Sequence, residues 1–122
     1  QARYLLFARA LGATIGIDRT IHWGEATADA WTDGRTRIVL TDSAVTSRKR
    51  AIWTHDILLT LCHEMAHNRS DKNRTAHGRR FESRFRDLIE DPEVRDAYTE
   101  LVTAIHDRGF QQVFADRGVT LG

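Results

Sequence analysis

The segment from residue 61 to 81, LCHEMAHNRSDKNRTAHGRRF, holds three of the chain's six histidines, and a glutamate directly follows the first of them. His63-Glu64-Met65-Ala66-His67 is an H-E-x-x-H pentapeptide. On a helix, residues four apart are separated by about 40° around the axis and by one turn along it, so both imidazoles can bind one ion. The spacing therefore predicts that His63 and His67 are two ligands of one metal ion.

Glu64 lies about 100° further round the same helix, near the ion but poorly placed to compete as a ligand. A carboxylate in that place can activate a zinc-bound water by accepting its proton, and can later return the proton to a leaving amine. This is the general-base role in zinc-dependent hydrolysis. A catalytic zinc takes three protein ligands and leaves one position open, so a third ligand must come from another part of the chain.

His77 is the best candidate for the third ligand. It follows His67 by ten residues across a polar stretch that can turn the chain back, and it precedes a helix expected from about Gly78. Gly78 leaves room for close approach to the active-site helix, because it has no side chain. Phe81 and Phe85 would bury the new helix against the core and so fix the position of His77.

Other residues remain alternatives for the third ligand. Glu82 or Glu90 could complete the site as a downstream glutamate does in gluzincins, and Asp71 could do so as in zincins with an aspartate ligand. A metzincin pattern is excluded, because it requires glycine where Ser70 stands and histidine where Asn73 stands.

A chance match is the competing interpretation of the pentapeptide. Such a match would usually fall in a loop or on a solvated face, whereas this one lies on the most apolar predicted helix. Two imidazoles and a carboxylate buried there would be costly without a shared partner. The position of the motif therefore favours a metal site.

The elements before the motif include one helix and a small sheet. Residues 2–11 suit a short helix that stops at Gly12. Residues 13–41 read as short β-rich pieces, with Asp33-Gly34 marking a hairpin turn. We expect a small antiparallel sheet that ends in a strand from Arg35 to Leu40.

Helices follow the sheet. From about Trp53 to Asn68, apolar residues surround most of the predicted active-site helix, which places it inside the domain. A further helix begins near Gly78. Asp91-Pro92 starts another, with Asp as the N-cap, and Gly109 ends it. The tail from residue 110 to 122 gives no clear pattern.

Length and composition bound the alternatives. The 122 residues suit one domain, with 41% hydrophobic and 29% charged residues. No apolar run approaches the roughly 20 residues of a membrane span, and no signal peptide is recognisable, so the expected location is the cytoplasm.

Cys62 is the single cysteine, which excludes an internal disulfide and leaves His and carboxylates as metal ligands. Because the chain starts at Gln1, we expect a processed product or a domain excised from a longer protein whose other domains are partners.

Charge is unevenly distributed although the net charge is only +1. Residues 48–86 contain ten Lys or Arg and four Asp or Glu, whereas residues 87–122 contain three and eight. A basic flank beside the motif could guide nucleic acid, although a solvated charged face is the commoner explanation.

The runs ATADAWTDGRTRIVLTDSAV, ILLTLCHEMAH and HGRRFESRF resemble SprT-like zinc metallopeptidases, a group that includes the Spartan proteases of DNA–protein crosslink repair. The related WLM and YgjP-like metallopeptidases share much of the pattern. The resemblance covers roughly residues 12–90. Its specific parts are the H-E-x-x-H helix and the later His-Gly-x-x-Phe.

The resemblance implies an α+β zincin or minigluzincin-like domain, in which the sheet packs on the active-site helix and two further helices follow. It implies one zinc ion at His63, His67 and His77, with Glu64 as the general base. It also implies that the strand from Arg35 to Leu40 is an exposed edge that binds a protein or peptide substrate by strand addition. The spacing from His67 to His77 is shorter than in typical members, and the cysteine-rich zinc ribbon that many carry is absent.

The expected activity is zinc-dependent hydrolysis of peptide bonds. Two other functions are possible alternatives. One is a zinc-bound but catalytically silent module that binds or regulates within a larger protein, against which the intact Glu64 argues. The other is a DNA-dependent protease of the Spartan type, motivated by the basic stretch.

Overall fold

The computed structural model describes residues 2–17, 19–24, 30–32, 37–41, 53–67 and 78–121. Its helices are α1 (Ala2–Thr14), α3 (Trp53–Ala66), α4 (Arg79–Glu90), α5 (Pro92–Arg108) and α6 (Phe110–Arg117), and its strands are β1 (Thr20–Trp23), β2 (Ala30–Thr32) and β3 (Arg37–Leu40). The predicted α+β class is confirmed. None of the described helices has the length and apolar character needed to cross a membrane.

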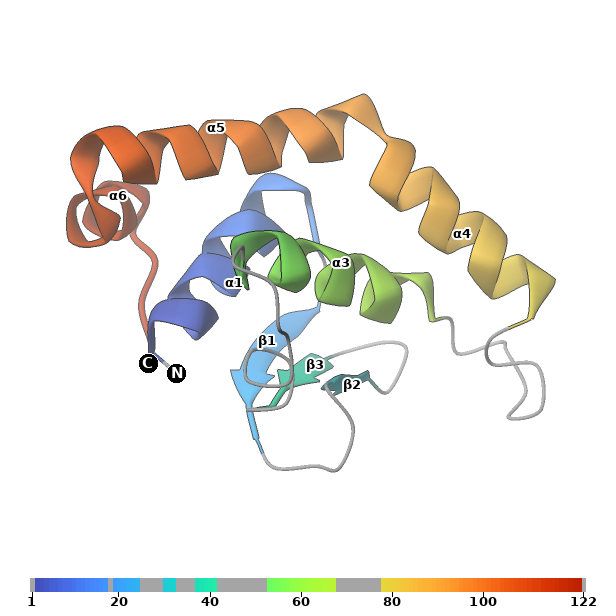
Figure 1. Cartoon of the computed structure of the whole chain (residues 1–122). Helices are drawn as coiled ribbons and strands as arrows, with labels where there is room; N and C mark the ends of the chain where they lie inside the picture. Colours follow the sequence, from blue (N-terminus) through green and yellow to red (C-terminus); the bar gives the residue numbers. More distant parts are fainter. Residues whose placement is uncertain are drawn as a thin grey trace.

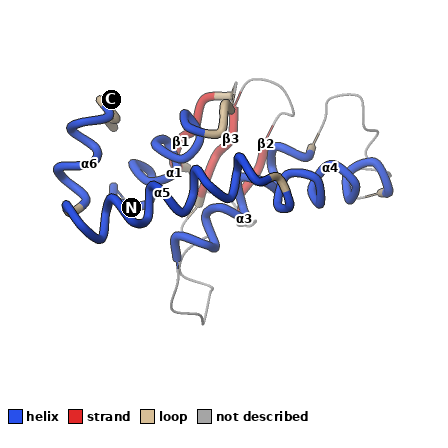
Figure 2. The backbone as a smooth tube through the Cα atoms, turned by 90° about the horizontal axis from the view of Figure 1, so that it is seen from above, coloured by secondary structure: helices blue, strands red, loops and turns tan. Residues whose placement is uncertain are grey.

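The helices lie on one face of the sheet in two layers. α1 and α3 lie side by side, α1 against β1 and α3 against β2 (Figure 1). α5 crosses on the side of α1 away from the sheet, and α4 descends from its end to contact α3 (Figures 1 and 2). The most deeply buried large apolar side chains come from all of these layers: Phe7, Leu11, Ile38, Leu40, Ile57, Leu61 and Leu101. The predicted interior position of the active-site helix is therefore confirmed.

The sheet differs from the antiparallel one expected from the sequence. Its strand order is β1-β3-β2, in which β2 and β3 are antiparallel but β1 and β3 are parallel. The antiparallel β2–β3 pair agrees with the predicted hairpin, although residues 33–36, which include Asp33-Gly34, lie outside the described part. Ile38, Val39 and Leu40 are all buried, so β3 has apolar contacts on both faces. A strand buried on both faces is best placed in the centre of a sheet.

The central position of β3 corrects the expectation for the strand from Arg35 to Leu40. Residues 37–40 form hydrogen bonds with a strand on each side and do not provide an exposed edge. The outer strands are β1 and, among the described residues, β2. At the β1 edge, Arg9 Nε donates to the carbonyl oxygen of Ile21 at 2.9 Å.

Gly12 does not end the first helix as predicted. α1 continues to Thr14, and Gly16 beyond it adopts a positive φ of 77°. A Cβ atom at Gly12 would lie 2.8 Å from Cδ1 of Ile21 and 3.3 Å from Cδ1 of Ile17. Gly12 therefore permits close packing of α1 on β1 and the segment before it.

The helical boundaries after the sheet follow the sequence signals closely. α3 begins at Trp53 and ends at Ala66, two residues short of the predicted Asn68, which lies outside the described part. α4 begins directly after Gly78, and α5 begins with Pro92 after the N-cap Asp91 and ends before Gly109, as predicted.

Three helices follow α3 in the part of the chain that the structure describes, where two were expected. α6 lies in the tail whose sequence gave no clear pattern. Val113 and Phe114 are buried, and α6 packs against α1. Gly109 and Gly118, which both have positive φ, bound this short helix. Eight residues are too few for sequence periodicity to indicate a helix. A helix this short is also only marginally stable on its own, so the tertiary contact with α1 has to stabilise it.

The Asp91 cap offers a test of the corner that orients α4. Asp91 Oδ1 accepts a hydrogen bond from the backbone N–H of Glu93 at 2.9 Å, and Pro92 follows as the first helical residue. We expect Asp91→Ala to lower the free energy of unfolding by about 1 kcal/mol, because a helix N–H loses its acceptor. Asp91→Asn, which keeps an acceptor, should cost much less. Urea unfolding of both variants measures this difference, and equal losses would contradict the capping role.

Candidate metal site

His63, Glu64 and His67 come together at the end of α3. Each offers one ligand atom, and these atoms all lie within 4.8 Å of one another. The two imidazole rings are 5.1 Å apart between centroids and inclined at 78°. Donor atoms on a tetrahedral zinc with bonds of about 2.1 Å are about 3.4 Å apart, so small side-chain rotations would bring these atoms to one ion.

The burial of this group fits a shared cation better than a chance motif. Glu64 is only 4% exposed, and both histidines are half-buried. A carboxylate removed from water is costly unless a positive charge or a hydrogen-bond donor compensates it. Their donor set of two imidazole nitrogens and one carboxylate oxygen suits a divalent ion such as zinc. The residues present therefore fit a metal ion, which the His-Glu-His group could hold.

Burial also changes the acidity of Glu64. Removal from water raises its pKa from 4.5 to about 7, and the positive charge of Arg19 acts in the opposite direction. A carboxyl group with a pKa near neutrality can both accept and release a proton at physiological pH. In the metal-free protein Glu64 is thus a much weaker acid than an exposed glutamate.

An aromatic wall from α4 packs against the two imidazoles. The Phe81 ring lies 4.9 Å from His63 and 4.7 Å from His67, measured between ring centroids. The Phe85 ring lies 5.9 Å from both His63 and Phe81. Phe81 is itself buried, so water has little access to this side of the imidazoles. Phe81 is buried and Phe85 packs against the core, as predicted, whereas His77, whose position they were expected to fix, lies outside the described residues. Their contact with the two histidines was not predicted.

Two arginines bind the backbone at the end of α3. Arg19 donates from Nη1 to the carbonyl oxygen of Glu64 at 2.6 Å and from Nη2 to that of His67 at 2.9 Å. Arg84 Nε donates to the carbonyl oxygen of Ala66 at 2.7 Å. Neither arginine was predicted from the sequence, because neither lies in a recognisable motif and each is far from the helix end in sequence.

Only two of the four candidates for the third ligand lie in the described part of the chain. His77 and Asp71 lie outside the described residues, so His77 stays a prediction. Glu82 and Glu90 lie on α4 and are both exposed. Among the described residues, the group of converging ligand atoms does not include either glutamate. It does include the Glu64 carboxylate, which had been expected only near the ion.

The remaining described histidines and Cys62 lie outside this group of ligand atoms. His55 is exposed near the start of α3, where its ring lies 6.0 Å from that of Tyr98. His22 and His106 are also exposed. Cys62 is fully buried, as expected of a small core residue, and burial raises the pKa of its thiol to about 11.

The outer face of α4 carries charges of both signs. Exposed arginines and exposed acidic residues are both found along it: Arg79, Arg80, Glu82, Arg86, Asp87 and Glu90. The remaining arginine of α4, Arg84, is half-buried and binds the end of α3. α4 as a whole therefore presents a mixed surface, although Asp87 and Glu90 lie beyond the basic stretch of residues 48–86.

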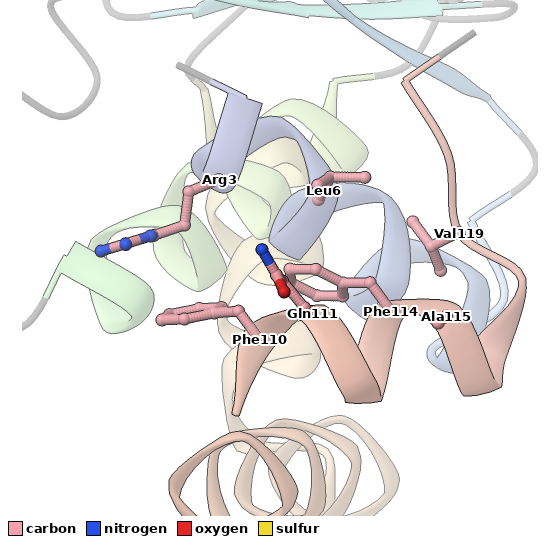
Figure 3. Close-up of a pocket in the computed structure, with 7 residues that line it drawn as sticks. All are labelled: Arg3, Leu6, Phe110, Gln111, Phe114, Ala115 and Val119. Carbon is pink, nitrogen blue, oxygen red and sulfur yellow. The ribbon is translucent and has the colours of Figure 1, made fainter. Parts of the chain in front are cut away.

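A groove lies between α1 and α6, at the end of the molecule opposite α4 (Figures 1 and 3). Leu6 from α1 and Phe110, Phe114 and Val119 from the C-terminal region supply most of its apolar lining. Arg3 lies over the Phe110 ring, 4.7 Å from its centroid. This groove contains none of the residues that carry the candidate chemistry.

Comparisons with protein-family models, with curated proteins and with solved structures found no match for the chain. The interpretation of the site therefore depends on the geometry and burial of its residues.

The raised pKa of Glu64 predicts a pH dependence of stability in the metal-free protein. Between about pH 4.5 and 7 the folded protein binds more protons than the unfolded chain, so the free energy of unfolding should fall as the pH rises through this range. Glu64→Gln removes this titration. We expect it to be more stable than wild type by about 3 kcal/mol at pH 8 and by only about 1 kcal/mol at pH 5.

Urea unfolding in the presence of a chelator measures both differences. Glu90→Gln, which removes a carboxylate from an exposed position, is the matched control. A Glu64→Gln advantage of the same size at both pH values would contradict the assigned cause.

Proposed function

We propose that the chain is a zinc-dependent metalloprotease that hydrolyses peptide bonds in a zincin-like domain. One observation supports this most directly: two imidazoles and a buried carboxylate, in H-E-x-x-H spacing, converge at one end of an interior helix. A site that only binds a metal ion needs its ligands but no base beside them. A carboxylate with a pKa of about 7 beside them also supplies a base.

In this proposal His63 and His67 hold the ion and His77 completes its protein ligands. When bound, zinc would polarise the scissile carbonyl and increase the acidity of a water molecule. The Glu64 carboxylate accepts a proton from the attacking water and delivers it to the nitrogen of the leaving amine. The buried position of Glu64 strengthens these charge interactions, because few water molecules screen them.

The sheet suggests where an extended substrate would lie. The central position of β3 excludes strand addition along residues 37–40, so the substrate edge has to be an outer strand. β2 packs against α3, whereas β1 packs against α1. In addition, Arg9 bridges β1 to the C-terminal tail by donating from Nη1 to the carbonyl oxygen of Thr120 at 2.8 Å. We therefore propose β2 as the edge that binds a peptide substrate.

A zinc-bound, catalytically silent binding module remains the main alternative. Such a module needs metal ligands but has no use for a carboxylate with a raised pKa next to them. The two functions therefore differ in their dependence on Glu64. A DNA-dependent protease gains no specific support from the described face of α4, which carries both charges.

The catalytic role of Glu64 can be tested with zinc-loaded protein and casein or a peptide library. We expect Glu64→Gln to retain zinc but to lower kcat by about 10²-fold to 10⁴-fold, because the water loses its proton acceptor. Glu90→Gln should keep the wild-type rate. Identical cleavage patterns in wild type and Glu64→Gln would favour the binding module.

The third ligand can be tested by measuring zinc content. Wild type purified and re-equilibrated with limiting zinc should hold one ion per chain, and His63→Ala and His67→Ala should hold very little. If His77 is the third ligand, His77→Ala should bind zinc much more weakly, while His106→Ala, at an exposed position far along α5, should bind normally. Unchanged affinity in His77→Ala would assign the third ligand to another residue.

A further inference from the structure

The predicted pair of metal ligands, His63 and His67, lies where the regular helical hydrogen bonding of α3 stops. α3 ends at Ala66, and His67 is the first residue beyond it. The last four carbonyl groups of an α-helix have no partner within the helix. His67 donates its backbone N–H to the carbonyl oxygen of Glu64 at 3.3 Å, which is the tighter bonding of a final 3₁₀-type turn. Helix geometry alone therefore does not fix the second imidazole.

Arg19 connects the two residues whose spacing matters most. Its Nη1 donates to the Glu64 carbonyl and its Nη2 to the His67 carbonyl, at 2.6 and 2.9 Å. One planar guanidinium thus spans the last turn and the residue after it. A lysine ammonium on a flexible stem cannot reproduce this two-pronged geometry. The positive charge is also favourable at a helix C-terminus.

Arg84 binds the same turn from a different element. Its Nε donates to the carbonyl oxygen of Ala66 at 2.7 Å. Phe81, three residues earlier on α4, packs against the rings of His63 and His67. Residues three apart on a helix share a face, so α4 contacts both the imidazoles and the backbone that carries them.

We propose that Arg19 and Arg84 are positioning residues, which hold the last turn of α3 from two sides and so keep His67 aligned with His63 for metal binding. This inference rests on the proposed metal site. Neither arginine has to contact the substrate. Without them, the last turn would sample conformations in which the imidazoles diverge, and the apparent metal affinity would fall with the fraction of aligned molecules.

The test uses Arg19→Gln, Arg84→Gln and Arg19→Lys, with Arg86→Gln as the matched control. Arg86 is an exposed arginine on the same helix as Arg84. Metal-free proteins are titrated with Co²⁺, whose visible absorption reports the ligand geometry. Loss of an interaction that orients a metal ligand typically weakens binding about 10-fold to 100-fold, and we expect that loss for both Gln variants. Arg86→Gln should bind as wild type does.

Arg19→Lys separates orientation from charge. It keeps the positive charge but not the pair of hydrogen bonds, so we expect weakened Co²⁺ binding close to that of Arg19→Gln. Wild-type affinity in Arg19→Lys would overturn the two-pronged role of Arg19. Circular dichroism establishes that each variant is folded. If Arg19→Gln does not fold, Arg84→Gln and Arg19→Lys still decide the proposal.

Two further measurements separate positioning from other roles. In metal-free protein, the backbone N–H of His67 should exchange with solvent faster in Arg19→Gln than in wild type. At saturating zinc, kcat for peptide hydrolysis should return to the wild-type value in Arg84→Gln and Arg19→Lys, because both variants keep the positive charge at residue 19 that acts on Glu64. A kcat that stays low in these two fully loaded variants would overturn the positioning role.

The proposal and the function on which it rests fail in different ways. If wild type does not bind Co²⁺ or zinc, the proposed metal site is overturned and the positioning role falls with it. If wild type binds the metal, but both Gln variants match it in affinity, spectrum and His67 exchange, only the positioning role is overturned.

Discussion

The last turn of α3 has to meet two requirements at once. Its side chains converge on a small volume suited to a cation, and its terminal carbonyl groups lack partners inside the helix. Arg19 and Arg84 meet the second requirement from opposite directions along the chain, since one precedes β1 and the other lies on α4. The surrounding fold brings both elements to the helix end. The close packing at Gly12 holds α1 against β1, and the corner at Asp91 directs α4 back toward α3.

The burial of Glu64 changes its acidity. α3 is an interior helix, so Glu64 is almost fully buried and its pKa rises to about 7. The same burial would penalise stability if the group had no function, because a charged or partly charged carboxylate is removed from water. A bound cation would offset that cost by pairing with the carboxylate and the imidazoles. Under the proposed function, the burial of Glu64 would therefore lower the stability of the metal-free protein and favour the reactivity of the loaded protein.

Local sequence signals predicted the parts of the structure that depend on near neighbours. The spacing of His63 and His67, the apolar surroundings of α3, and the Asp91-Pro92 helix start are such signals, and the described structure agrees with them. The parallel pairing of β1 with β3 was not predicted, because strand neighbours depend on which strand is buried on both faces. The roles of Arg19 and Arg84 were missed for a similar reason. Arg19 lies 45 and 48 residues from its acceptors, and Arg84 lies 18 residues from its own.

The proposed function requires that the imidazoles of His63 and His67 bind one zinc ion together. Zinc K-edge X-ray absorption of protein loaded with one equivalent of the metal tests this most directly, because it reports the neighbours of the ion itself. We expect a four-coordinate ion with nitrogen or oxygen neighbours at about 2.0–2.1 Å and the multiple-scattering pattern of at least two imidazoles. That pattern should be lost in His63→Ala and His67→Ala. A spectrum with sulfur at about 2.3 Å, or one with only oxygen neighbours and no imidazole pattern, would contradict it.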